Sequence, residues 1–408
     1  MADHSTHHQA RVTLPYPRQP KYGQGERQAV LRLLDRGKLS ETGRGEATAA
    51  LEDAFAEMTG TPHVLSFNSG TAALHAAVHA VADPDQDVAV SPMTWISAIT
   101  AVLHAGRVPV LCDLEPDSPN LDPAEVASRS DRIGAVVATH TWGIPARVDE
   151  LTHASGRPVI EDCSHAHGAL YRHRPVGAWG AAGAFSVQES KAVSGGEGGV
   201  LTTTDRAVYE RAMVVGHHPH RLAAELSSSD LLALAETGMA HKFRMPALSA
   251  AIAREQLRGL PERSAAASAN LATLLGVLDH HAAPITVPAL DEGSVRGWYG
   301  TPLIITEPVT DPTELFQRVT DAGVPLRALY PDWAASPLLR DPDLLHRCWP
   351  HVHPGRYTPA DPRDFPNYYR ARRQLLVLKV PYVLAPDYME QVAHTLVDVL
   401  TRFLTKGA

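Results

Sequence analysis

One lysine stands out by what surrounds it in the sequence. Lys191 lies between the apolar stretch 183–187 and the glycine-dense turn Gly195–Gly199. Upstream, the apolar stretch Val159–Cys163 contains two adjacent acids, the second of which is Asp162. A lysine amine at one strand end and a carboxylate at another suit a site for pyridoxal 5′-phosphate (PLP). The amine condenses with the aldehyde of PLP, and the carboxylate keeps the pyridine nitrogen protonated. A surface lysine that follows a buried strand is the alternative.

The stretch Asn68–Leu74 has the composition of an anion-binding helix start. Small residues follow a strand-like run there, so the backbone can approach a ligand, and the first free N–H groups of a helix bind anions. Ser186, shortly before Lys191, adds a hydroxyl that can reach the same phosphate. Trp95 follows the next strand-like run, where its ring can stack on a flat cofactor. The plainer alternatives are a helix capped by Ser69 and a tryptophan of the core.

These residues belong to a chain that alternates between strand and helix patterns. Short apolar runs rich in β-branched residues are separated by helical patterns, and the runs are residues 64–67, 87–91, 108–112, 134–139 and 158–163. Continuous apolar runs indicate strands buried on both faces, as in a parallel sheet. We therefore expect an α/β fold with three layers around a mainly parallel sheet. Residues 183–187 and 199–203 are expected to pair like a hairpin around the lysine loop.

The pattern becomes richer in strands towards the end of the chain. We predict a large PLP-binding domain at residues 1–270 and a smaller α+β domain at residues 271–408. The large domain would include a polar N-terminal arm that contains His4, His7 and His8. The proline-rich residues 334–370 are expected to form a surface excursion or a lid.

Composition excludes several classes of protein. The net charge is −8 and no long Lys/Arg block occurs, so a nucleic-acid partner is not expected. Three cysteines, far apart in the sequence, argue against a disulfide framework or a cysteine-based zinc site. Two histidine groups lack the spacing that by itself predicts a metal site, so we predict none; they are His217, His218 and His220, and His165 with His167. Because neither a signal pattern nor an apolar run of about 20 residues occurs, a cytoplasmic location is expected.

Taken in order, six motifs resemble the DegT/DnrJ/EryC1/StrS family of PLP-dependent sugar aminotransferases, which have fold type I. The motifs are Ser69–Leu74, Trp95, Glu161–Gly168, Phe185–Gly199, Lys242–Met245, and Ala250-Ala251 followed by Gln256-Leu257. No single motif is strong, but six in the same order over about 180 residues are highly specific, and the resemblance covers nearly the whole chain. The resemblance implies transfer of an amino group from L-glutamine or L-glutamate to a keto-sugar or keto-cyclitol in secondary-metabolite biosynthesis.

The resemblance also implies a role for each matched residue. Lys191 would bind PLP and move the proton, Asp162 would pair with the pyridine nitrogen, and His165 would lie near the phenolic oxygen. Trp95 would stack on the ring. The phosphate would be held by four residues, Gly70, Thr71, Ala72 and Ser186. Lys242 would reach the phosphate of a second subunit, so a homodimer with shared active sites is implied.

Departures from the family pattern bear on the acceptor. Gln188 and Glu189 stand where many members have His-Pro, and Lys242 stands where many have Asn. Both changes favour the branch that acts on cyclitol ketones, or that makes aminohydroxybenzoate, over the common sugar-nucleotide branch. The segment Gly216–His220 replaces a usual Arg-x-His-Gly stretch, which leaves substrate contacts there open.

The sequence leaves open which arginines bind the acceptor, and it allows two alternative functions. Arg221, Arg244 and Arg327 are candidates to bind the diphosphate of a sugar nucleotide. A PLP-dependent dehydratase or cyclase of the same family is the first alternative function, and a non-catalytic PLP-binding regulator is the second. The presence of both Lys191 and Asp162 argues against the regulator.

Overall fold

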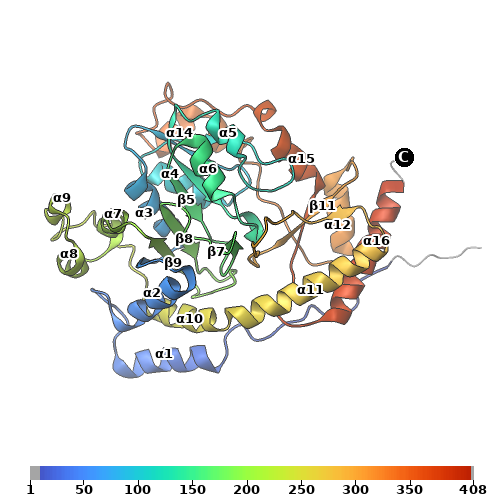
Figure 1. The fold of residues 1–408 in the computed structure, drawn as a ribbon, viewed down its shortest axis with the longest axis horizontal. Helices are drawn as coiled ribbons and strands as arrows, with labels where there is room; N and C mark the ends of the chain where they lie inside the picture. Colours follow the sequence, from blue (N-terminus) through green and yellow to red (C-terminus); the bar gives the residue numbers. More distant parts are fainter. Residues whose placement is uncertain (1–9, 406–408) are drawn as a thin grey trace, which may run out of the picture.

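The computed structural model describes residues 10–405, in which two sheets are joined by a long helix (Figure 1). The larger sheet has seven strands in the order β1-β9-β8-β5-β4-β2-β3. Its strands are β1 (His63–Phe67), β2 (Asp87–Val90), β3 (Pro109–Leu111), β4 (Ile133–Thr139), β5 (Val159–Asp162), β8 (Ala182–Ser186) and β9 (Gly199–Thr203). Only β9 runs antiparallel to its neighbours, and β8 and β9 form the antiparallel pair expected around the lysine loop.

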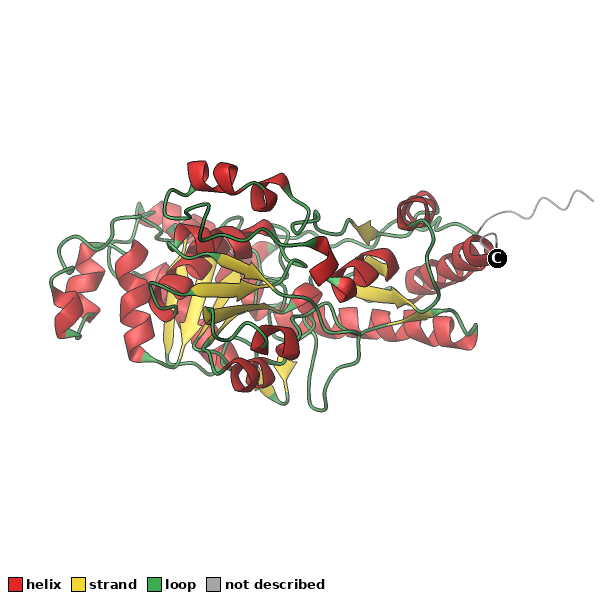
Figure 2. Ribbon diagram, turned by 90° about the horizontal axis from the view of Figure 1, so that it is seen from above, coloured by secondary structure: helices red, strands yellow, loops and turns green. Residues whose placement is uncertain are grey.

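Helices cover both faces of this sheet (Figure 2). One face carries α3 (Gly70–Val81), α4 (Ile96–His104) and α7 (Arg206–Gly216). The other carries α2 (Glu46–Thr59), α5 (Pro123–Ala127), α6 (Val148–Ser155) and α10 (Ala247–Arg258), with α1 (Gln24–Arg36) outside α10.

Alternate residues of the central strands explain why both faces need a cover. In β4, Ala135 and Val137 belong to the core of the first face, while Val136 and Ala138 belong to that of the second. Successive side chains of a strand point to opposite faces, so a continuously apolar run is buried on both sides. The predicted three-layer α/β class is confirmed.

The smaller sheet is antiparallel, in the order β10-β11-β13-β12. Its strands are β10 (Ile285–Thr286), β11 (Thr301–Ile305), β12 (Leu326–Arg327) and β13 (Leu375–Leu378). A separate core joins this sheet to α11 (Leu260–His280), α12 (Pro312–Asp321) and α16 (Pro386–Thr405). The predicted boundary after residue 270 falls inside α11, which contacts both parts of the chain, so the division into domains stays a prediction.

Residues 333–374 return from the smaller sheet to the larger one. They contain α13 (Pro337–Arg340), α14 (Pro342–Cys348), η2 (Pro362–Asp364) and α15 (Pro366–Gln374). The indole of Trp333 donates to the carbonyl of Thr94 at 2.8 Å, and the carboxylate of Asp113 accepts the N–H groups of Asn367 and Tyr368. Their buried apolar side chains join the core of the first face, so this segment is packed onto the larger layer.

The N-terminal segment lies against the smaller part of the structure. The N–H of Val12 donates to Ala322 at the end of α12, and Tyr16 packs edge-on against Tyr388 of α16 with ring centres 5.8 Å apart. The predicted histidines of the arm, His4, His7 and His8, lie outside the described residues.

Five short elements complete the described chain. A hairpin of β6 (Leu170–Tyr171) and β7 (Arg174–Pro175) follows β5, and the turn η1 (Thr141–Gly143) follows β4. The helices α8 (Pro219–Glu225) and α9 (Ser229–Leu232) follow α7. Among residues 10–405, no helix combines the length and the apolar composition needed to cross a membrane.

Candidate active site

A cavity of about 450 Å³ opens where the lysine loop meets the start of α3 and two tyrosines from the C-terminal part of the chain. Seven of the nine predicted site residues line it: Gly70, Thr71, Trp95, Asp162, His165, Ser186 and Lys191. The two others, Ala72 and Lys242, do not. The structure therefore brings together residues that are up to 121 positions apart in the sequence, from Gly70 to Lys191.

Two neighbouring acids at the end of β5 have different environments. Asp162 lines the cavity, while Glu161 is fully buried on the other side of the strand. The alternation of side chains along a strand separates them. Glu161 accepts hydrogen bonds from the backbone N–H groups of Gly177, Trp179 and Gly180 at 2.7–2.8 Å, so it anchors the loop after β7.

Glu161 also belongs to the one buried group within residues 10–405 whose atoms could approach a metal. Potential ligand atoms of His140, Glu161 and Cys163 lie within 4.8 Å of one another. Nδ1 of His140 accepts the N–H of Ala146 at 2.9 Å, so Nε2 carries the hydrogen and donates to Glu161 at 3.1 Å. Both ring nitrogens and the carboxylate thus have protein partners, which makes this group a structural anchor.

Lys191 projects into the cavity from the loop between β8 and β9. Burial lowers the pKa of its amine from the ordinary 10.5, with Tyr299 and Asp162 opposing the shift. Its Nζ lies 4.0 Å from the ring centre of Tyr299. A lysine with a lowered pKa holds more free amine near neutral pH, which nucleophilic attack and proton abstraction both require.

The start of α3 packs directly against the end of β8. A Cβ on Gly70 would lie 2.6 Å from Cβ of Ser186 and 3.1 Å from its Oγ. A Cβ on Gly199 would lie 2.3 Å from the carbonyl oxygen of Ser69. Both glycines are needed for this close approach, which brings the Ser186 hydroxyl to the helix N-terminus. The result is a cradle of backbone N–H and hydroxyl groups suited to a phosphate.

Thr71 and Ala72, two of the predicted phosphate ligands, differ in the hydrogen bonds that they already make. The hydroxyl of Thr71 donates to Oγ of Ser97 at 2.9 Å, and both residues line the cavity. The N–H of Ala72 donates to the side chain of Ser69 at 3.0 Å, as in an ordinary N-cap. The structure therefore places Ala72 beside the cradle with its backbone donor already engaged.

The glycine-dense turn after Lys191 packs closely against neighbouring segments. A Cβ on Gly195 would lie 2.6 Å from the carbonyl oxygen of Ser249 in α10. Gly198 has a φ of 154°, which side-chain-bearing residues rarely adopt. These glycines hold the lysine loop against α10 and the cradle.

His165 is buried with both ring nitrogens engaged. Nδ1 accepts the backbone N–H of Trp142 at 3.3 Å, and Nε2 lies 3.0 Å from the hydroxyl of Tyr330. Burial, followed by the charges of Lys191 and Arg327, lowers the pKa of His165 well below 6.5, so the ring is neutral. Because Nδ1 accepts, Nε2 carries the hydrogen and donates to Tyr330.

Aromatic rings form one wall of the cavity. The ring of His165 stacks on Tyr299 with centres 4.2 Å apart and planes 3° apart, and Trp142 stacks on Tyr330 at 5.7 Å. Trp95 caps the N-terminus of α4 with 53% of its surface exposed and lies 6.2 Å from the Tyr330 ring. The exposed Trp95 is therefore free to cover a flat ligand.

Lys242 is exposed and lies outside the cavity of its own chain. Its backbone has a φ of 54°, and the two residues that follow it are held to the end of β1 and to the residue after it. The carbonyl of Phe243 accepts the N–H of Asn68, and Arg244 forms an isolated bridge with Phe67. The side chain thus projects from a firmly held segment next to the phosphate cradle.

The three arginines predicted as diphosphate ligands lie at different distances from the cavity. Arg221 is buried in an ion pair with Glu52, and Arg244 donates to the carbonyl of Glu41. Neither lines the cavity, while Arg327 contacts the ring of Tyr299 at 4.2 Å. Of the predicted diphosphate candidates, only Arg327 is next to the site.

The histidines of the segment 217–220 also lie outside the cavity. His217 is buried against Phe67 with ring centres 5.1 Å apart, and burial lowers its pKa well below 6.5. The N–H of His220 donates to the ring of His218 at 3.1 Å. This segment therefore contributes packing and turn structure outside the cavity.

Several residues that line the cavity are not among the predicted site residues. Tyr299 and Tyr330 come from loops of the C-terminal part, more than 100 residues after Lys191. Gln188 accepts the N–H of Ser190 at 2.8 Å, and both line the cavity. The departure from the family pattern at Gln188 could have marked that residue, but nothing in the local sequence marks the tyrosines.

Comparisons with known proteins agree with this architecture. A family model described as the DegT/DnrJ/EryC1/StrS aminotransferase family matches residues 20–346. An L-glutamine:2-deoxy-scyllo-inosose aminotransferase of Streptomyces lividus is 35% identical over 277 residues, or 65% of each chain. The alignment thus spans slightly less than two thirds of that relative.

A solved structure shows the fold over its whole length. An aminotransferase from Psychrobacter cryohalolentis superposes with a TM-score of 0.82 and 24% identity, covering 96% of this chain and 100% of the other. The fold is therefore that of this group of enzymes, as the motifs predicted. Since the family model covers well over half of the sequence, the chain belongs to the DegT/DnrJ/EryC1/StrS aminotransferase family.

Proposed function

We propose that the protein is a PLP-dependent aminotransferase that moves the amino group of L-glutamine to a keto-cyclitol or a related keto-sugar. One observation carries the proposal: Lys191, Asp162 and the cradle at Gly70 and Ser186 line a single cavity. The relative from Streptomyces lividus is named for L-glutamine and 2-deoxy-scyllo-inosose, which supports this choice of donor and acceptor.

The chemistry of the cavity fits PLP at four points. The close approach of Gly70 to Ser186 leaves helix N–H groups and a hydroxyl for the phosphate. Asp162 offers a carboxylate for the pyridine nitrogen, and Lys191 offers the amine for the aldehyde. The exposed Trp95 can cover one ring face.

When bound, PLP supplies an electron sink for the carbon that carries the amino group. The side chains of the protein transfer the proton and position the reacting groups. Lys191 moves the proton at that carbon, and burial lowers the pKa of its amine from the ordinary 10.5, which favours the free amine that this step requires. Tyr299 lies against the amine and limits where it can point.

A homodimer belongs to the same proposal. Lys242 projects outward from a segment that is fixed beside β1 and the phosphate cradle. A second copy would place this amine at the phosphate of its partner. Lys242→Ala should then weaken PLP binding in the dimer without changing the stability of the subunit.

The test follows the visible absorbance of the protein loaded with PLP. Addition of L-glutamine should change the spectrum, and mass spectrometry should detect the keto acid; addition of 2-deoxy-scyllo-inosose should then restore the spectrum. Lys191→Ala is the matched control and should show neither change. A protein that binds PLP but does not respond to L-glutamine or L-glutamate would contradict the proposal.

A further inference from the structure

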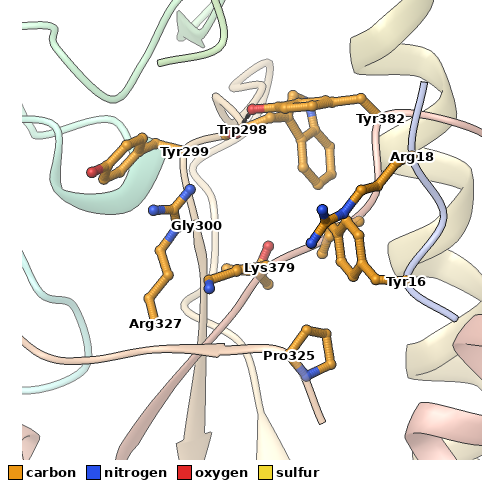
Figure 3. A pocket seen from close by; sticks show the side chains of 11 residues that line it. Tyr16, Arg18, Trp298, Tyr299, Gly300, Pro325, Arg327, Lys379 and Tyr382 are labelled. Carbon is orange, nitrogen blue, oxygen red and sulfur yellow. Dashed lines mark hydrogen bonds between the residues drawn. The ribbon is translucent and has the colours of Figure 1, made fainter. Parts of the chain in front are cut away.

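A second cavity, of about 250 Å³, adjoins the first and shares Tyr299 with it. Three segments far apart in the sequence contribute its charged side chains (Figure 3). Arg18 comes from the N-terminal segment, Arg327 from β12, and Lys379 from the residue after β13. The fold therefore gathers three cations around one hollow.

Among the residues that the structure describes, no acid lines this cavity. Among residues 10–405, no carboxylate forms an ion pair with Arg18, Arg327 or Lys379, and Nε of Arg327 is buried without a hydrogen-bond acceptor. Partial burial, followed by the charges of Arg327 and Arg18, lowers the pKa of Lys379. These positive charges repel one another and lack a counter-charge, so binding of an anion would neutralise them.

Tyr299 connects this cavity to the reacting lysine. The guanidinium carbon of Arg327 lies 4.2 Å from the centre of the Tyr299 ring, and Nζ of Lys191 lies 4.0 Å from the same centre. A small molecule whose anionic end binds Arg327 therefore has its other atoms within reach of Lys191.

We propose that this cavity binds the anionic group, a carboxylate or a phosphate, of a substrate that reacts at Lys191. The inference rests on the proposed function, since it assigns this group to a substrate of that site. A keto-cyclitol has no charge, whereas the amino donor carries a carboxylate next to the reacting carbon, so the donor is the first source. A phosphate on the acceptor is the second source of the same chemistry.

Two substitutions and one control test the cavity. Arg327→Gln and Lys379→Gln remove one charge each while keeping most of the side-chain length. Arg363→Gln is the control, because this arginine is 89% exposed and pairs with Asp361 away from the cavity. Calorimetric titrations of the PLP-loaded protein use glutarate, which has carboxylates but no amine, and inorganic phosphate in a separate series.

Loss of one charge-assisted hydrogen bond should weaken binding of the anion about tenfold or more in both cavity variants and leave the control unchanged. If glutarate shows this pattern, the site takes the donor carboxylate. If only phosphate shows it, the site takes a phosphorylated acceptor. If Arg327→Gln and Lys379→Gln bind both anions as the unaltered protein does, or if that protein binds neither, the proposal is overturned.

The dependence of the spectral change on L-glutamine separates this inference from the function itself. Arg327→Gln should raise the L-glutamine concentration for half-maximal rate about tenfold if the carboxylate binds there. If no amino donor changes the spectrum while anion binding still depends on Arg327, the proposed function fails and the anion site stands.

Discussion

Replacing Gly70 by alanine tests the phosphate cradle through one methyl group. The new Cβ would lie 2.6 Å from Cβ and 3.0 Å from Cα of Ser186. Carbon atoms in contact are ordinarily about 3.5–4.0 Å apart, so the start of α3 and the end of β8 must separate by about 1 Å. Overpacking of this kind costs about 1–3 kcal/mol of folding free energy. The same displacement moves the helix N–H groups away from the Ser186 hydroxyl, and we expect PLP affinity to fall about tenfold or more.

The assay combines urea unfolding with a spectroscopic titration of PLP, and Gly276→Ala serves as control. Gly276 lies within α11, and a Cβ added there would meet nothing within 4 Å. Alanine should stabilise that helix by about 0.5–1 kcal/mol and leave PLP affinity unchanged. If Gly70→Ala binds PLP as tightly as the unaltered protein, the cradle does not hold the phosphate and our reasoning is refuted.

Four other substitutions probe the site and its support. Lys191→Ala should abolish amino transfer with an unchanged far-UV circular dichroism spectrum. Asp162→Asn should still bind PLP but slow the L-glutamine half-reaction severely in stopped-flow absorbance; an unchanged rate would give Asp162 another role. Arg221 makes two bonds of 2.8 and 3.0 Å to the buried Glu52, so Glu52→Gln should cost about 3–5 kcal/mol in urea unfolding. Burial lowers the pKa of His167 to about 3. Below pH 6.5 the unfolded chain therefore binds a proton that the folded chain does not bind, so the free energy of unfolding decreases as the pH is lowered. His167→Phe should remove about 1 kcal/mol of the loss between pH 7.5 and 5.5, and an unaltered loss would show that other groups cause it.

The larger sheet could be predicted because its strands are buried on both faces. Each central strand is a short run of apolar residues such as Ile133–Thr139, and a run of this kind has few other ways to bury both sides. Parallel strands also bring their carboxyl ends to one edge, which is why Asp162 and Ser186 meet there. Motifs that follow such strands in the sequence thus end up at the same edge, and most of the predicted PLP-binding residues come from these motifs.

The C-terminal contributions could not be predicted for a physical reason. Residues 333–374 have no periodic pattern strong enough to show which surface they pack on, and their position depends on contacts such as that of Trp333 with Thr94. The same holds for Arg18 and Lys379, which approach Arg327 only because the smaller sheet and the N-terminal segment meet. Local sequence patterns do not specify long-range packing of this kind.

His165 and Tyr330 illustrate how the two halves of the chain complete one another. The family resemblance places His165 near the phenolic oxygen of the cofactor, yet both of its nitrogens already have partners, Trp142 and Tyr330. Since Nε2 donates to the Tyr330 oxygen, that hydroxyl must direct its own hydrogen elsewhere, and Tyr330 lines the cavity. Burial raises the pKa of Tyr330 well above 10, so the hydroxyl keeps this hydrogen at neutral pH. The hydrogen bond that a sequence motif assigns to the histidine is therefore available to a ligand from the tyrosine, with His165 fixing its orientation.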